Sequence, residues 1–101
     1  MNYSLFVHPL ARLDILHAVV WYEDQRPGLG FQMSDQVHAA MRRAAETPLA
    51  FAIVEGRTRR VLARRFPYAV FFRVDGNRLV VMAVSHVRRD PIAWRSRAAK
   101  V

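Results

Sequence analysis

The segment that most constrains the fold is a run of ten residues, 78–87, which reads RLVVMAVSHV. In an extended strand, alternate side chains point to opposite faces, and here both alternating sets are largely apolar. One set comprises Val80, Met82, Val84 and His86, and the other comprises Leu79, Val81, Ala83 and Ser85. We therefore expect a strand that is covered on both faces, which requires packing elements on two sides of one sheet.

Other β-prone runs supply the neighbours of this strand. Residues 59–66 (RRVLARRF) and 68–74 (YAVFFRV) precede it, and Asp75-Gly76-Asn77 before it is a hairpin-turn signal. Residues 3–7 (YSLFV) form a further short run, which His8-Pro9 ends. The pattern predicts an N-terminal strand and a three-stranded β-meander.

Two helices are predicted between the first strand and the meander. The first covers about residues 10–25, with Pro9 in its first turn, and carries apolar and histidine side chains at helical spacing: Leu10, Leu13, His17, Val20 and Trp21. The second ends near Thr47-Pro48 and has a longer stripe: Leu29, Met33, Val37, Ala40, Met41 and Ala44. Residues 25–30 (QRPGLG) oppose a continuous helix, so the two helices form an antiparallel hairpin.

The tail supplies the last element. In residues 90–95, Asp90 suits an N-cap and Pro91 the first helical position, so a short helix is expected there. The helix hairpin covers one face of the sheet and the tail partly covers the other. The fold class is therefore α+β, in one domain spanning residues 1–101. Trp21, Tyr22, Met33, Met41 and the Phe71-Phe72 pair are expected in the core, and core is also favoured for Trp94.

The charge of the chain is unevenly distributed. Its formal net charge is +8, from 16 basic and 8 acidic residues. Residues 1–50 carry four arginines and five acids, whereas residues 51–101 carry twelve basic residues and three acids, a net charge of +9. Fifteen of the basic residues are arginine, whose planar guanidinium suits phosphates and carboxylates. This asymmetry indicates an acidic or phosphate-rich partner that docks on one surface.

Several classes of site are excluded or disfavoured. With no cysteine, the chain has no disulfide scaffold, thiol nucleophile or thiolate metal site. The four histidines, at positions 8, 17, 38 and 86, share no tight metal-ligand spacing, so we expect no metal and no cofactor. No stretch approaches the roughly 18 apolar residues of a membrane span, and the N-terminal apolar run is too short for a signal peptide. We expect a cytoplasmic protein without membrane contact.

Five strings in this order resemble the RelE/ParE superfamily of type II toxin–antitoxin toxins. They are residues 21–23 (WYE), 26–30 (RPGLG), 59–62 (RRVL), 65–73 (RFPYAVFFR) and 83–91 (AVSHVRRDP), the last followed by Trp94. The resemblance covers nearly the whole chain. It implies a small bacterial growth-inhibiting toxin, of the plasmid-stabilisation type, that an acidic and partly disordered antitoxin wraps and neutralises in a hetero-oligomer. The net positive half agrees with such a partner.

The resemblance implies one of two activities. A RelE-like toxin cleaves messenger RNA in the ribosome, without a metal, and needs proton-transfer groups and arginines that stabilise phosphorane charge. A ParE-like toxin inhibits DNA gyrase by protein contact. RelE-like nucleases usually carry an arginine in the middle strand of the meander, where this chain has residues 66–71 (FPYAVF). Residues 85–91 (SHVRRDP) are similar to the His-x-Arg-x-Asp string of the ParE-like branch, which we favour.

The candidate residues follow from these alternatives. If the chain is a nuclease, the implied catalytic set is His86, Arg65, Arg89 and Glu55. Candidates for contact with antitoxin or target are Arg60, Arg64, Arg65, Arg88, Arg89 and Trp94. Several of these residues also have a structural interpretation. In that interpretation His86 fixes the corner between strand and tail, and Arg88 and Arg89 pair with Asp90 and the tail carboxylates. Arg64 and Arg65 are expected to point to opposite faces of a strand, so one of them is expected to form a surface or structural pair. A third hypothesis is an inactive family member that only binds its antitoxin or DNA.

Overall fold

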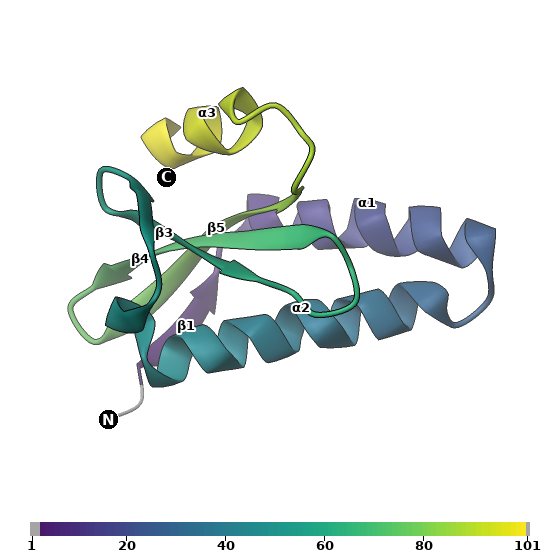
Figure 1. Ribbon diagram of the computed structural model, residues 1–101, viewed down its shortest axis with the longest axis horizontal. Helices are drawn as coiled ribbons and strands as arrows, with labels where there is room; N and C mark the ends of the chain where they lie inside the picture. The colour runs from purple at the N-terminus through teal and green to yellow at the C-terminus, as the bar shows by residue number, and fades with distance from the viewer. Residues whose placement is uncertain (1–2, 101) are drawn as a thin grey trace.

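The computed structural model describes residues 3–100, with side chains up to residue 99. A five-stranded sheet forms its centre, in the order β1-β5-β4-β3-β2 (Figure 1). β1 runs parallel to β5, and the other neighbouring pairs are antiparallel. In chain order the elements are β1 (Ser4–Val7), α1 (Pro9–Gln25), α2 (Leu29–Glu46), the 3-10 turn η1 (Pro48–Ala50), β2 (Ile53–Glu55), β3 (Thr58–Leu62), β4 (Tyr68–Asp75), β5 (Arg78–His86) and α3 (Ile92–Lys100).

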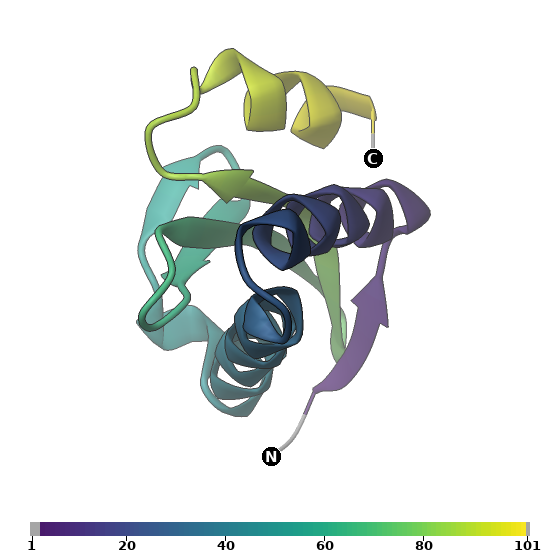
Figure 2. The same cartoon turned by 90° about the vertical axis from the view of Figure 1, so that its right-hand side faces the viewer.

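The elements lie in three layers, with the sheet between the helix hairpin and α3 (Figure 2). The main core fills the space between the sheet and the α1–α2 hairpin and includes Met33, Met41 and Phe72, all fully buried. A smaller core on the opposite face consists of Ala69, Phe71, Ala83 and Trp94. The expected α+β architecture, with helices on one face and the tail helix on the other, is confirmed.

The meander has more strands than the sequence indicates. β2 is a short edge strand that the sequence analysis missed, so four strands rather than three follow the helices. β3 ends at Leu62, and residues 63–67 form a loop. The prediction that Arg64 and Arg65 lie on a strand and point to opposite faces is therefore wrong. Arg65 adopts a φ of 70°, in the left-handed region that a strand does not contain, just before Phe66-Pro67.

A bulge changes the face of the sheet to which the later side chains of β5 point. Phe71 pairs with Ala83 but Phe72 pairs with Val81, so Met82 is an extra residue on β5. Val84 consequently shares the main core with Leu79 and Val81, whereas Ala83 faces α3. The expected strict alternation along β5 is wrong beyond Val81, while burial on both faces is confirmed because every residue from Leu79 to Ser85 is buried.

The apolar stripe on α1 faces outward rather than into the core. We call Leu10, Leu13, His17, Val20 and Trp21 the α1 stripe; Trp21 is 57% exposed and Val20 is 54% exposed. The core face of α1 is instead made by Ala11, Ile15 and Ala18. The prediction that Trp21 is core is wrong, because helical spacing defines a face without saying which of two apolar faces packs. The same prediction for Met33, Met41, Phe71 and Phe72 is confirmed, and Tyr22 is partly buried against the main core.

The turn between α1 and α2 is fixed by a carboxylate. Glu23 accepts hydrogen bonds from the backbone N–H groups of Gly28 (3.0 Å), Gly30 (2.7 Å) and Phe31 (3.3 Å). These donors lie at the N-terminus of α2, where the helix dipole favours negative charge. The bond from Gly28 is the largest of the effects that lower the pKa of Glu23, with smaller contributions from Gly30 and Phe31 and an opposing effect of burial.

At Gly30 the two helices approach each other closely. A Cβ there would collide with the carbonyl oxygen of Val19 and lie 2.8 Å from Cγ of Glu23. We expect Gly30→Ala to lower the free energy of unfolding by about 2 kcal/mol, in spite of the higher helix propensity of alanine. Urea denaturation measures the loss. Asp35→Ala, at an exposed position on the same helix, is the control, and equal stability of the two variants would contradict the close approach.

The Glu23 carboxylate makes stability depend on pH. Its pKa is lower in the folded than in the unfolded chain, so its contribution is complete above the ordinary value of 4.5 and is lost as pH falls through the folded value. We expect Glu23→Gln to be less stable than the parent protein near pH 7, with a difference that shrinks below pH 4.5. Urea midpoints of both proteins across this range provide the measurement, and a constant difference would be the contrary result.

Candidate functional site

Most arginines of residues 51–101 lie near one of the two ends of the sheet. The register pairs Asp75 with Arg78 at one end and Tyr68 with His86 at the other. The turn between β2 and β3 also lies at the Asp75 end. β3 begins near this end, where Arg59 pairs with Phe72, and runs toward the other end, where Leu62 pairs with Ala69. We call the other end, which carries the β3–β4 loop and the segment after β5, the arginine end. It holds Arg64, Arg65, Arg88 and Arg89.

Three of the four ion pairs among the described residues lie at the Asp75 end. Asp75 binds Arg57 at 2.7 Å and Arg73 at 3.0 Å, and Glu55 binds Arg95 of α3 at 3.1 Å. The hydrogen bond from Arg73, followed by that from Arg57, holds the pKa of Asp75 below its usual value. These ion pairs stabilise the sheet turns and α3, whereas the exposed Arg78 at the same end lies over the Phe6 ring and forms no ion pair with the described residues.

The arginine end is not compensated. All four of its arginines are exposed, and none forms an ion pair within the part of the chain that the structure describes. The expected pairing of Arg88 and Arg89 with Asp90 is absent among these residues, because the Asp90 carboxylate instead accepts the backbone N–H of Ile92 at 3.0 Å and caps α3. The Arg65 guanidinium donates to Oε1 of Gln32 at 3.3 Å and lies over the ring of Phe66.

His86 occupies the corner where β5 ends. Its Nδ1 accepts a hydrogen bond from the backbone N–H of Arg88 at 3.1 Å. Its ring lies edge-on to that of Tyr68, with the two ring centroids 5.4 Å apart. These contacts are those of a residue that fixes the path from strand to tail. His86 nevertheless lies at the same end as Arg65, Arg88 and Arg89.

Glu55 is remote from the other nuclease candidates. It pairs with Thr58 next to the β2–β3 turn, at the Asp75 end, whereas His86 ends β5 at the arginine end. On β4 these levels correspond to Arg73 and Tyr68, five residues or about 17 Å apart. The structure therefore brings His86, Arg65 and Arg89 to one end and leaves Glu55 at the other. Arg60 is exposed on the α3 side of the sheet, opposite Phe71 in the register.

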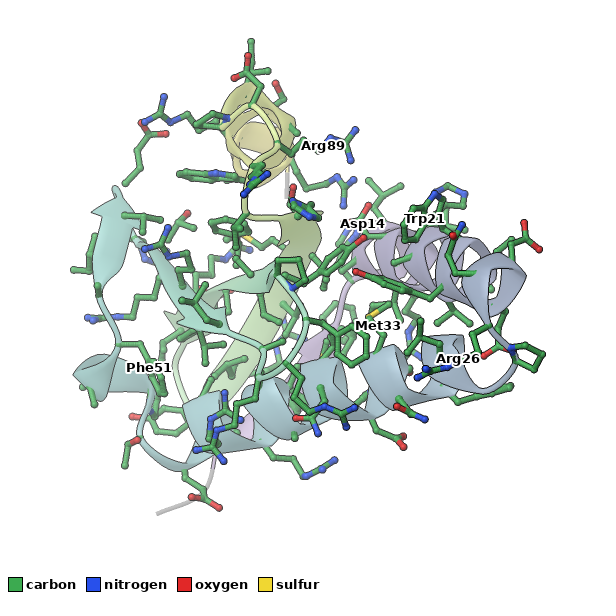
Figure 3. All side chains as sticks on the ribbon, turned by 45° about the vertical axis from the view of Figure 1, so that its right-hand side comes forward. Asp14, Trp21, Arg26, Met33, Phe51 and Arg89 are labelled. Atoms are coloured by element: carbon green, nitrogen blue, oxygen red, sulfur yellow. The ribbon has the colours of Figure 1, made fainter. Side chains whose placement is uncertain are left out.

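A cleft between α1 and α3 opens beside the arginine end. It consists of two adjoining hollows of about 280 and 250 Å³. Both are lined by Asp14, His17, Val84 and Arg89. Ser85, Trp94 and Arg97 complete the first hollow, and Trp21 and Tyr68 complete the second, among other residues. Figure 3 shows Asp14 and Trp21 on the side of α1 that faces Arg89, whereas Met33 lies between the two long helices.

The walls of this α1–α3 cleft combine apolar and cationic groups. Trp94 is 9% exposed and stacks on Phe71, with ring centroids 4.6 Å apart and planes 13° apart. The pKa of Tyr68 is raised mainly by burial and further by Tyr22, while the nearby Arg89 opposes the rise. Ser85 is buried, and its Oγ has no hydrogen-bond partner in residues 3–99.

An ion pair holds α3 and α1 to the free edge of β5. β1 pairs with β5 only up to Val81, so the later residues of β5 have no strand neighbour on that side. Asp14 accepts the backbone N–H of Val84 at 2.9 Å, and Arg97 donates to the carbonyl of Met82 at 3.1 Å. Asp14 and Arg97 also bind each other through two hydrogen bonds of 3.1 Å. Two side chains thus replace the missing strand.

Sequence reasoning missed the polar residues of the cleft. Asp14, Ser85 and Arg97 drew no attention because they belong to three different elements. The available signal was Asp14, the single acid in the first half of α1, between Leu13 and Ile15. Across the described residues, no group of three or more histidine, aspartate or glutamate side chains is arranged to hold a metal ion. No helix in the same range is both long and apolar enough to span a membrane.

The ion pair of Arg97 should matter more than that of its neighbour Arg95. The side chains of Asp14 and Arg97 are 15% and 21% exposed, whereas those of Glu55 and Arg95 are about half exposed. We expect Arg97→Gln to lower the free energy of unfolding by about 2 kcal/mol, because a largely buried carboxylate loses its partner. Arg95→Gln, with the same charge change on the same helix, should cost less than about 1 kcal/mol. Urea denaturation compares the two, and equal losses would contradict this role of Arg97.

Comparisons with known proteins agree with the fold. One solved structure, of the chromosomal ParDE toxin–antitoxin system from P. aeruginosa, has a TM-score of 0.77 at 16% identity and covers 86% of this chain and 98% of that chain. The RelBE2 complex from Mycobacterium tuberculosis has a TM-score of 0.60 at 21% identity and covers 85% and 99%, respectively. A double-arginine mutant of the E. coli toxin RelE in the free state has a TM-score of 0.65 at 16% identity and covers 99% and 97%.

Sequence comparison places the chain in a family. A search of curated proteins finds no match. The model of the family described as the ParE toxin of the type II toxin–antitoxin system parDE, however, matches residues 5–91, which is most of the chain. The chain therefore belongs to the ParE toxin family of type II toxin–antitoxin systems, within the RelE/ParE superfamily.

Proposed function

We propose that this chain, as a single toxin domain of a plasmid-stabilisation-type module in the bacterial cytoplasm, arrests growth by binding DNA gyrase, and that an acidic cognate antitoxin neutralises it. The observation that carries the choice of target is the dispersal of the nuclease candidates. Ribose-phosphate cleavage needs a proton acceptor and a proton donor at one phosphate. Glu55 and His86, the two candidates for these roles, are separated by most of the length of the sheet.

The middle of the sheet gives a second argument for protein contact. The α3-facing side chains of β4 include Ala69 and Phe71, which are buried in the smaller core under Trp94. Arg73, the arginine that β4 does contain, is hydrogen-bonded to Asp75 at the opposite end from His86. At the level of Ala69 and Phe71, β4 itself offers no cation to a phosphorane, which favours a target recognised by its shape and apolar contacts.

The antitoxin proposal rests on family and charge. The solved ParDE and RelBE2 structures are of toxin–antitoxin systems. An acidic antitoxin chain would be attracted to the uncompensated arginine end and would gain order as it buries apolar side chains.

One observation keeps a second function in view. His86, Arg65, Arg88 and Arg89 share the arginine end, which supplies one proton-transfer candidate and the cations that a RelE-like, ribosome-dependent endoribonuclease would need. The third hypothesis, an inactive antitoxin-binding member, predicts that expression causes no arrest.

Induced expression in a bacterium without the neighbouring antitoxin gene separates the three functions. Growth, transcript cleavage at ribosome-bound codons and gyrase-linked DNA breaks are scored in parallel. We expect arrest with DNA breaks and intact transcripts. Cleaved transcripts with intact DNA would refute the gyrase proposal in favour of the nuclease, and normal growth would favour the inactive member.

His86→Ala provides the sharpest single variant. If the chain acts by protein contact, we expect the variant to arrest growth as strongly as the parent protein, because His86 only fixes a corner of the backbone. A nuclease that depended on this residue for proton transfer would lose about 10²–10⁴-fold in rate. The measurement is growth after induction, with thermal unfolding of both proteins as the control for folding. Loss of toxicity in a folded variant would count against the proposal.

A further inference from the structure

We propose that the arginine end binds the phosphate backbone of double-stranded DNA, so that the toxin engages gyrase together with the DNA that gyrase holds. This inference rests on the proposed gyrase target and names a second partner within the same complex. The residues that carry it are the four exposed arginines of two loops, residues 63–67 and 87–91: Arg64, Arg65, Arg88 and Arg89.

The two loops have an excess of positive charge. They contain four arginines and one acid, Asp90, which leaves a surplus of three positive charges. The Asp90 carboxylate accepts the backbone N–H of Ile92, and neither it nor any of the four guanidinium groups forms an ion pair within residues 3–99. Arginine rather than lysine supplies all of these cations, and a planar guanidinium can bind two phosphate oxygens at once.

Backbone hydrogen bonds hold the two loops together. The N–H of Val87 donates to the carbonyl of Pro67 at 2.8 Å and so joins one loop to the other. The N–H of Ala63 donates to the carbonyl of Tyr68 at 2.9 Å and closes the first loop. The arginines thus extend from backbone positions that are already fixed, which reduces the conformational entropy lost on binding.

The aromatic side chains of this end favour the backbone of a duplex over a single strand. Proteins that bind single-stranded nucleic acid stack its bases on accessible aromatic rings. Here Phe66 is 8% exposed and its ring lies edge-on to that of Tyr22, with centroids 5.2 Å apart. The ring of Tyr68 contacts those of Tyr22 and His86. Because these rings pack on one another, the guanidinium groups are the main binding groups of this end.

The composition of the loops favours DNA over an acidic protein. The centre of a stable protein interface is apolar and depleted in charge, whereas a protein–DNA interface is polar and positively charged. Val87 is the one large apolar side chain of the two loops that is exposed, and four arginines accompany it. Several exposed cations with little apolar surface between them match a row of phosphates.

Binding to DNA can be measured without gyrase, by the fluorescence anisotropy of a labelled duplex. Two unrelated sequences of about 20 base pairs serve as probes, since phosphate contacts do not depend on sequence. If all four arginines contact phosphates, the logarithm of the affinity falls with the logarithm of the salt concentration at a slope of about −3.6. This slope corresponds to about 150-fold weaker binding at 200 than at 50 mM NaCl.

A pair of double variants tests which arginines are responsible. The side chains of Arg64 and Arg88 make no hydrogen bond or ion pair with the described residues, so replacing them removes charge alone. We expect Arg64→Gln combined with Arg88→Gln to reduce the slope to about −1.8. Arg42→Gln combined with Arg78→Gln makes the same charge change at two exposed positions away from the arginine end, and should keep the slope of the parent protein. Thermal unfolding of both double variants checks that they are folded.

The same proteins are then added to purified gyrase and plasmid DNA, and gyrase-linked DNA breaks are counted. At equal protein concentration we expect the variant with Arg64→Gln and Arg88→Gln to produce about tenfold fewer breaks than the parent protein. The control with Arg42→Gln and Arg78→Gln should produce as many breaks as the parent.

Four results would overturn the inference. Equal salt slopes for the two double variants would show that DNA does not contact these arginines. Tighter arginine-dependent binding of single-stranded oligouridylate than of the duplex would assign the arginine end to RNA. The same preference for polyglutamate would assign it to an acidic protein. Undiminished gyrase-linked breaks from a variant that no longer binds the duplex would show that the contact is not used on gyrase.

A failure of the gyrase target itself gives a different result. The parent protein would then bind the duplex through these arginines, with the expected slopes, and produce no gyrase-linked breaks. That outcome would refute the proposed target and support the DNA-binding surface, so the two failures are distinguishable.

Discussion

The structure depends on how β5 is accommodated. This strand is buried on both faces, so the fold needs a helical layer on each side of the sheet, and it is paired along only part of one edge. After Val7 the chain turns away from the sheet into α1. Without other partners, the remaining edge of β5 would therefore expose unpaired backbone groups. Asp14 and Arg97 satisfy two of these groups and each other. The same few contacts therefore join the first helix, the central strand and the last helix.

Much of the fold follows from local patterns in the sequence. The hairpin signal at residues 75–77, the glycine-proline break between the helices and the cap provided by Asp90 each predict a feature that the structure has. Each depends on residues that are adjacent in the chain. Two of the features that were missed, the bulge at Met82 and the partnership of Asp14 with Arg97, depend on residues that are not adjacent in the chain.

The α1 stripe shows why periodicity alone misled. α1 has two apolar faces, and the one that packs is the one with small residues, Ala11 and Ala18, which allow α2 and β5 to come close. Large side chains such as Trp21 give a stronger sequence signal, yet they remain outside. In the candidate site, the sequence singled out the arginines at positions 60, 64, 65, 88 and 89. Only the sheet register shows that the last four share one end, and that Arg60 and Glu55 lie elsewhere.

The parallel pairing of β1 with β5 has a consequence for folding. Ser4 lies beside Arg78, so this contact closes a loop that contains most of the chain, and such non-local contacts slow folding. During synthesis β1 leaves the ribosome long before β5 exists, so its backbone has no strand partner until residues 78–81 are made. α3 docks later still, because its binding place is built from both α1 and β5. The N-terminal strand thus begins the chain but is among the last parts to acquire its partner.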